Sequence, residues 1–356
     1  MADAIRAGVI GFGVAGRIFH AAVVDAVPGL ELACIVERHG DEGAKAHPGV
    51  TIYRDAQQAF DDPSIQLIII ATPNDIHYDL GRRALEAGKH VVIDKPFTID
   101  SADAARLVEL GRKNHLIVSA YQSRRWDGDF LTVKDILQSE TLGRLVSYES
   151  HFDRWRPIRK PQSWREAGGP GGGLLWDLGP HLMDQALQLF GIPYAVFADV
   201  RVEREGGVTV DAFDIHLYYP TISSVLLRVT CLSLVPGPRF NLIGDRGCFL
   251  KYGLDPQEDL LKAGQRFESP TWGTEPSKNW GVLTVEDEGN VVSKPVPTMA
   301  GDYRGYYANI RDAILGKAPL AVTAEQATQV IRMLELAAES SRKRAAVLCD
   351  LGGFPS

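Results

Sequence analysis

The sequence lacks any long hydrophobic run. Its longest apolar runs are short, such as residues 67–70, whereas a membrane-spanning helix needs roughly 18 apolar residues. The first six residues, Met1 to Arg6, contain no apolar segment like that of a signal peptide. We therefore expect a cytoplasmic protein with no membrane partner.

Cysteines are few, and basic residues are fewer than acidic ones. The four cysteines, Cys34, Cys231, Cys248 and Cys349, lie far apart without a Cys-x-x-Cys pair, which favours reduced thiols and predicts no metal site. Lys and Arg number 38 against 45 Asp and Glu, giving a formal net charge of −7. We therefore expect no nucleic-acid partner, although a local arginine cluster could still hold an anionic substrate.

The 356 residues are too many for one hydrophobic core and fit two domains. Strand-like and helix-like segments alternate at first, which predicts an α/β domain with a doubly wound parallel sheet. We place this dinucleotide-binding Rossmann domain at residues 1–122. Its expected strands are residues 7–10, 30–36, 66–71, 90–93 and 116–120, and its clearest expected helices are residues 17–26 and 79–87.

After about residue 125 the pattern changes to mostly strand-like segments joined by short turns. This change predicts an α+β domain at residues 123–356 with a large, mainly antiparallel open sheet, expected to bind substrate and to form oligomers. Its expected strands are residues 145–152, 194–204, 212–219, 224–229 and 239–243, and its expected helices are residues 130–139 and 324–342.

A glycine-rich motif follows the first expected strand and begins a helix. It reads Gly11-Phe12-Gly13-Val14-Ala15-Gly16. In this pattern the first glycine makes a tight turn, the second lets pyrophosphate approach the backbone, and the third lets the helix pack on the strand. The helix N-terminus then favours the anion. We predict a dinucleotide site here; an ordinary glycine-rich turn is the alternative.

Glu37 follows the second expected strand, about 20 residues after the last glycine. Its carboxylate can accept hydrogen bonds from the ribose hydroxyls and would repel a 2′-phosphate, which favours NAD. Arg38 leaves NADP open, because an arginine at this place can hold the phosphate. The alternative is that Glu37 is a solvated charge at a strand end.

Two further motifs carry side chains suited to proton transfer. Asp94-Lys95-Pro96 follows a buried strand at the edge where parallel sheets bind ligands, so Lys95 could polarise a substrate hydroxyl. Asp177 and His181 lie four residues apart at the start of a helix expected from Pro180. Because histidine has a pKa near 6.5 and lysine one near 10.4, we assign proton transfer to His181 and its orientation to Asp177.

The alternatives are that Lys95 is an ordinary surface lysine and that His181 has only a structural role. Both residues, however, belong to one ordered set of motifs. With Thr72-Pro73-Asn74, His77 and residues 171–184, the whole chain resembles the Gfo/Idh/MocA family of sugar and polyol dehydrogenases. The resemblance implies Lys95, Asp177 and His181 as the catalytic set. It also implies a cofactor site that includes Thr72, Pro73, Asn74, His77, Asp94 and Lys95.

Finer stretches are similar to the NADP-dependent scyllo-inositol 2-dehydrogenase branch of that family. They are Phe19-His20-Ala21 and residues 123–127, 149–154 and 251–258. Two pairs of residues differ: that branch tends to have small hydroxyl residues at 37 and 38, and His-Asn where this chain has Gln122-Ser123. We also expect a substrate pocket of nine side chains: Lys95, Arg124, Trp126, His151, Asp153, Arg154, Trp164, Asp177 and His181.

The sequence thus predicts an oxidoreductase that moves a hydride between NAD(P) and a secondary alcohol of a sugar, inositol or related polyol. NAD is the expected cofactor, with NADP left open. Two alternatives are an NAD-dependent glycosidase that oxidises its sugar transiently and a non-catalytic dinucleotide-sensing protein. The family resemblance also implies a homodimer or homotetramer.

Overall fold

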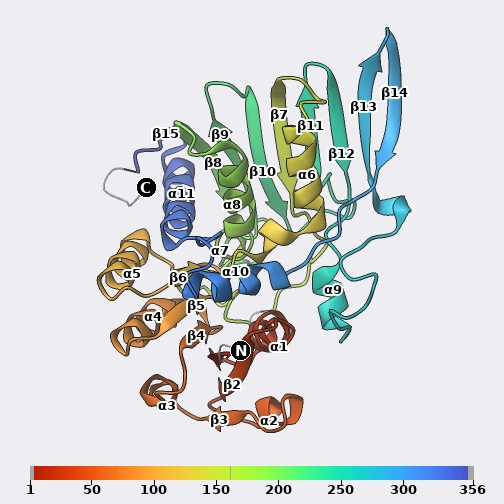
Figure 1. Cartoon of the computed structure of the whole chain (residues 1–356). Coiled ribbons are helices and arrows are strands. Elements are labelled where there is room, and N and C mark those ends of the chain that lie inside the picture. The colour runs from red at the N-terminus through yellow and green to blue at the C-terminus, as the bar shows by residue number, and fades with distance from the viewer. Residues whose placement is uncertain (1–3, 161, 352–356) are drawn as a thin grey trace.

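The computed structural model describes residues 4–160 and 162–351, and Figure 1 shows two sheets one above the other. The first sheet has six parallel strands in the order β3-β2-β1-β4-β5-β6. This is the doubly wound order of a Rossmann fold, with the crevice for a dinucleotide where the order reverses at β1 and β4. The strands are β1 (Ile5–Ile10), β2 (Leu30–Val36), β3 (Thr51–Tyr53), β4 (Leu67–Ile70), β5 (His90–Ile93) and β6 (Val118–Ala120).

Helices cover both faces of this sheet, which is why strands such as β4 are apolar at every position. One face packs on α1 and α10, and the other on α3, α4, α5 and α11. The predicted helix at 17–26 starts earlier, as a π-helical segment Ala15–Ala21. The helices between the strands are α1 (Ala22–Asp25), α2 (Glu42–Ala46), α3 (Ala56–Asp61), α4 (His77–Glu86) and α5 (Ser101–Lys113).

The second sheet has nine strands in the order β14-β13-β12-β11-β7-β10-β9-β8-β15. Its neighbours are antiparallel except for the parallel pair β7 and β10, which confirms the predicted mainly antiparallel sheet. The strands are β7 (Leu145–His151), β8 (Ala195–Arg201), β9 (Ala212–Tyr218), β10 (Ser224–Thr230), β11 (Phe240–Gly244), β12 (Gly247–Lys251), β13 (Gly281–Asp287), β14 (Asn290–Val296) and β15 (Val347–Leu348).

One face of the second sheet buries its alternate side chains against α6, α8 and α11 (Figure 1). The opposite face presents half-exposed side chains, as in the burial alternation of β10. Within the described ranges, no helix is both long and apolar enough to cross a membrane. The remaining helices are α6 (Gly128–Gln138), α7 (Leu174–Asp177), α8 (Gly179–Phe190), α9 (Gln257–Lys262), α10 (Arg304–Ile314) and α11 (Ala324–Lys343).

The helix α11 joins the cores of both sheets. Ala327 and Ile331 pack with the first sheet, whereas Val330 and Leu334 pack with the second. The apolar stripe predicted for this helix is therefore shared between two cores. The boundary at residue 122 stays a prediction, and the predicted domains also extend over residues 1–3 and 352–356, outside the described residues.

Candidate active site

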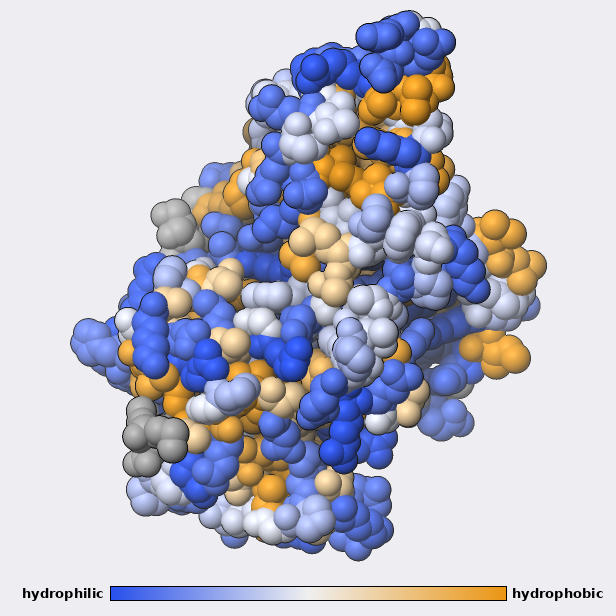
Figure 2. All heavy atoms as spheres, turned by 45° about the vertical axis from the view of Figure 1, so that its right-hand side comes forward, coloured by the Kyte–Doolittle hydropathy of each residue, from blue (hydrophilic) through white to orange (hydrophobic). Residues whose placement is uncertain are grey.

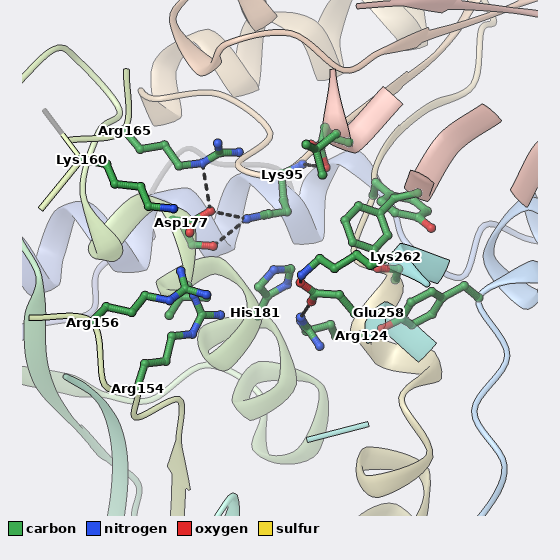
Figure 3. A pocket seen from close by; sticks show the side chains of 18 residues that line it. Lys95, Arg124, Arg154, Arg156, Lys160, Arg165, Asp177, His181, Glu258 and Lys262 are labelled. Carbon is green, nitrogen blue, oxygen red and sulfur yellow. Dashed lines mark hydrogen bonds and ion pairs between the residues drawn. The ribbon is translucent and has the colours of Figure 1, made fainter. Parts of the chain in front are cut away.

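A cavity of about 440 Å³ opens between the two sheets, beside the carboxyl ends of the first sheet's strands (Figure 3). Its wall is built from the glycine-rich loop, the end of β5, the turn after β6, the loop after β7, and α7, α8 and α9. Open α/β sheets bind ligands in such a crevice, at the point where the strand order reverses.

Lys95 and Asp177 form an ion pair at the centre of this cavity. Nζ of Lys95 donates to Oδ1 of Asp177 at 2.8 Å and to its carbonyl oxygen at 2.7 Å. Burial alone would raise the pKa of Asp177, but the charges of Lys95 and then Arg165 hold it below its usual value. The carboxylate is therefore ionised, and one of the three lysine N–H donors remains for a ligand.

His181 lies in the first turn of α8, after Pro180 as predicted. The residue is 6% exposed, and its Nδ1 atom has no hydrogen-bond partner among the described residues. Burial lowers the pKa of the imidazole, and the positive charges of Lys95 and Arg124 lower it further. The ring is therefore neutral near pH 7 and can accept a proton.

The expected contact between Asp177 and His181 is corrected by the structure. Both side chains face the cavity (Figure 3), but the carboxylate pairs with Lys95 and not with the imidazole. The reason is that α7 ends at Asp177 and α8 begins at Gly179, so the two residues are not neighbours on one continuous helix. Asp177 thus positions Lys95 rather than His181.

The glycine-rich loop has the geometry that a dinucleotide requires. Gly11 has a φ of +94°, a left-handed conformation that favours glycine. A Cβ on Gly16 would lie 1.9 Å from the carbonyl oxygen of Gly11, whereas one on Gly13 would meet no described atom within 4 Å. The fold itself needs the first and third glycines, while Gly13 leaves an open surface at a helix start, where pyrophosphate fits.

Glu37 lies in the turn after β2, and its carboxylate already accepts backbone hydrogen bonds. The N–H of Glu42 donates to Oε1 at 3.3 Å, and the N–H of Gly43 donates to Oε2 at 3.1 Å. These bonds fix the carboxylate at the start of α2, while the neighbouring Arg38 is exposed. Their contacts with a cofactor stay a prediction.

Other predicted cofactor residues join the ends of β4 and β5. The ring nitrogens of the buried His77 contact the carbonyl oxygens of Pro96 at 2.9 Å and Thr72 at 3.0 Å. Asn74 donates from Nδ2 to the carbonyl oxygen of Gly171 at 2.8 Å. These contacts hold the strand ends against the glycine-rich segment before α7, so the two sides of the cavity are fixed relative to each other.

Asp94 lines the cavity and lies close to His20, a contact that was not predicted from the sequence. Oδ1 of Asp94 accepts the backbone N–H of Lys95 at 2.8 Å and lies 3.7 Å from Nε2 of His20. Nδ1 of His20 forms a 2.6 Å hydrogen bond with the hydroxyl of Tyr307. The stretch Phe19-His20-Ala21 was part of the family resemblance, but its pattern did not indicate this contact.

Five of the nine predicted substrate residues line the cavity; they are Lys95, Arg124, Arg154, Asp177 and His181. Arg124 comes from the turn after β6 and donates to Asp127 at 3.1 Å and to Glu258 at 2.6 Å. Burial would raise the pKa of Glu258, but Arg124 and Lys262 together outweigh burial, and the pKa falls to about 2. Glu258 therefore stays ionised and fixes Arg124 at the cavity wall.

The other four predicted residues, Trp126, His151, Asp153 and Trp164, lie outside the wall, contrary to expectation. Trp126 packs edge-on against Tyr306, with ring centroids 5.7 Å apart, and Trp164 stacks on Arg165. His151 and Asp153 bond to each other at 3.2 Å. Successive residues of an extended chain point to opposite sides, which explains why Arg154 faces the cavity while Asp153 does not.

Several charged residues of the cavity wall were not predicted from the sequence. They are Arg156, Lys160, Arg165, Glu258 and Lys262. A signal was available for two of them: Arg156 follows Arg154 by two residues in an extended segment, and Arg165 adjoins Trp164. The remaining three come from a loop and a short helix whose place against the cavity depends on the tertiary fold.

Comparison with known proteins identifies the family. Residues 5–122 match the NAD-binding Rossmann fold of the Gfo/Idh/MocA oxidoreductase family, and residues 134–348 match its C-terminal α/β domain. The chain belongs to this family. Because the first of these domains is the NAD-binding one, the cofactor of this Gfo/Idh/MocA oxidoreductase is a nicotinamide dinucleotide, NAD(P).

Relatives of this Gfo/Idh/MocA protein match over nearly their whole length. YdgJ of Escherichia coli, an uncharacterized oxidoreductase, is 44% identical over 98% of this chain and 99% of its own. The scyllo-inositol 2-dehydrogenase (NADP(+)) IolW of Bacillus subtilis is 35% identical over 98% and 97%. The solved structure of YPO2259 from Yersinia pestis has a TM-score of 0.94, 43% identity and 99% coverage of both chains.

Proposed function

We propose that the protein is a dehydrogenase of the CH–OH group of a sugar, inositol or related polyol. The observation that carries the proposal is the meeting of Lys95 and His181 in one cavity beside the open glycine-rich loop. A cation and a neutral imidazole beside a nicotinamide are what alcohol oxidation needs: one polarises the oxygen and the other takes its proton. The name of the relative IolW points to the same substrate class.

In the proposed reaction, the carbon that bears the hydroxyl loses a hydride, and NAD(P)⁺ held beside the glycine-rich loop would supply the hydride acceptor. The free N–H of Lys95 donates to that oxygen, while Asp177 holds the ammonium in place. His181 accepts the hydroxyl proton, because burial and its positive neighbours keep the imidazole neutral. The reverse reaction returns the proton from His181 to the oxygen.

The cofactor would be held by chain segments around the reversal of strand order. Gly11, Gly13 and Gly16 shape the place for pyrophosphate, with Val14 and Ala15 in the cavity wall. The dinucleotide's adenosine end would approach the turn after β2, and its nicotinamide end the end of β5. The phosphate contacts come from backbone N–H groups at the helix start.

The experiment that tests this function is a screen of purified protein with NAD⁺ and NADP⁺ against inositols, hexoses, glycosides and sugar acids. We expect reduced cofactor to accumulate in step with polyol loss. Glycoside cleavage without net cofactor reduction would indicate the transient-oxidation glycosidase instead. Cofactor binding without turnover of any polyol would indicate a sensing protein.

A further inference from the structure

Positive charge is concentrated in the cavity wall, although the whole chain carries a net charge of −7. The wall contains an excess of four Lys and Arg over Asp and Glu. Arg124 and Lys262 are balanced by Asp127 and Glu258, and Lys95 is balanced by Asp177. The unbalanced charge therefore lies on the opposite side, in the loop that follows β7 (Figure 3).

Arg154 and Arg156 are the centre of this unbalanced charge. Neither guanidinium has a carboxylate within 4 Å among the described residues. Burial and the neighbouring charge of Arg156 lower the pKa of Arg154. Two cations side by side in a partly buried wall repel each other, so their placement costs stability unless an anion joins them.

The backbone holds both arginines in place. The N–H of Arg154 donates to the carbonyl oxygen of Thr230 at 2.9 Å, and the N–H of Arg156 donates to that of Cys231 at 2.7 Å. This extended segment therefore continues the pairing with the end of β10, and residues two apart point to the same side. In Figure 3 both side chains extend from this segment into the cavity, and the charge of Arg156 acts on Arg154.

Lys160 and Arg165 extend the cluster toward the ion pair of Asp177. Arg165 lies 3.6 Å from Oδ1 of Asp177, and its guanidinium stacks 4.6 Å from the ring centroid of Trp164. Lys160 lies in the cavity wall beside them (Figure 3). The cations thus continue along one cavity wall from Arg154 and Arg156 to the ion pair of Lys95 and Asp177.

We propose that Arg154 and Arg156, with Lys160 and Arg165, form a subsite for an anionic substituent, phosphate or carboxylate, on the substrate. Arginine suits this task because its planar fork donates two parallel hydrogen bonds to a carboxylate or phosphate. The substrate class is then a sugar or polyol phosphate or a sugar acid, bound with its CH–OH group at Lys95 and His181. This inference rests on the proposed dehydrogenase function.

The kinetic test compares matched substrates: glucose, glucose 6-phosphate and glucuronate, and myo-inositol with its monophosphate. We expect kcat/KM for one anionic series to exceed that of the neutral parent by about ten- to hundredfold, the range of charge-assisted hydrogen bonds. The ratio should fall toward one in Arg154→Gln/Arg156→Gln and at high salt. Phosphate and carboxylate arms separate the two sources of charge.

Arg159→Gln is the matched control, because Arg159 lies in the same loop but outside the cavity wall; it should keep the wild-type ratio. Two results together would contradict the anion subsite: neutral polyols turn over as well as or better than anionic ones, and the double variant affects both classes alike. The proposed dehydrogenase function would remain intact.

A binding test decides the question even if no substrate turns over. Titration calorimetry with inorganic phosphate, on protein saturated with NAD⁺, should detect one site that Arg154→Gln/Arg156→Gln removes and Arg159→Gln retains. Phosphate binding that is absent, or unchanged in the double variant, would contradict the anion subsite.

Discussion

At the scale of single residues, the account depends on the different environments of Lys95 and His181. The Nζ atom of the lysine is paired with the carboxylate of Asp177, which fixes its position in the cavity. The histidine lines the same cavity, and burial with positive neighbours lowers its pKa, so its neutral ring can accept a proton. In the proposed mechanism, polarisation of the oxygen and acceptance of its proton therefore belong to two different residues.

For His181→Ala we predict a fall in kcat by about 10²–10⁴-fold, the usual contribution of a general acid or base, with little change in NAD(P) affinity. The kcat/KM of wild-type oxidation should decline only below pH ~6.5, the ordinary histidine pKa, because burial and the charges of Lys95 and Arg124 lower the pKa of His181. Oxidation needs the neutral ring, so activity is lost as pH falls through the lowered pKa.

The pH profiles of two variants check this assignment. The acidic decline should vanish in His181→Ala and persist in Lys95→Met, although both are slow. The opposite pattern would make Lys95 the base and leave His181 to position the substrate.

For cofactor choice we predict that NAD is preferred over NADP by at least several-fold in kcat/KM. The Glu37 carboxylate is fixed by the N–H groups of Glu42 and Gly43 and would repel a 2′-phosphate. Glu37→Gln removes the charge but keeps an acceptor oxygen, so it should move preference toward NADP. Preference of the wild type for NADP would indicate that Arg38 dominates.

Among the structural elements, the glycine-rich turn contains one glycine that the fold requires, Gly16, and one that leaves room for the cofactor, Gly13. A Cβ on Gly16 would collide with the backbone of Gly11, whereas one on Gly13 would meet open space in the described structure. We predict that Gly16→Ala lowers the thermal midpoint of unfolding, while Gly13→Val leaves it nearly unchanged and weakens NAD⁺ binding. Calorimetric melting and cofactor titration measure the two effects; equal destabilisation by both variants would contradict this division.

How far the elements could be predicted from sequence depended on the periodicity of each segment. The buried strands β4 and β5 and the apolar stripe of α11 were visible because continuous or periodic apolar residues mark them. The strands β13 and β14 were missed, since their burial is weak and their polar residues hide the alternation. The role of Asp177 was misassigned because no local pattern shows that α7 and α8 are separate helices.

At the scale of the whole molecule, the second sheet leaves one face without a covering helix layer among the residues described. Tyr218, Ile243 and Val282 are more than a third exposed, next to buried strand neighbours. Figure 2 shows hydrophobic patches on an otherwise polar surface, with the side of β13 and β14 turned forward. We predict that this face forms a homodimer or homotetramer.

Light scattering at micromolar concentration checks the assembly. A mass of two or four chains of 39.0 kDa each is expected, and Ile243→Lys together with Val282→Lys should shift it toward one chain. A stable wild-type monomer would contradict the prediction.

Hydride transfer from the polyol to the nicotinamide can be followed with an isotope label. Protein is incubated with NAD⁺ or NADP⁺ and an inositol or hexose that carries deuterium on its carbinol carbons, and the free reduced nicotinamide is analysed by mass spectrometry and NMR. The account predicts one deuterium at C4 of the released reduced cofactor for each polyol oxidised. Polyol conversion with no deuterium in free cofactor would contradict it.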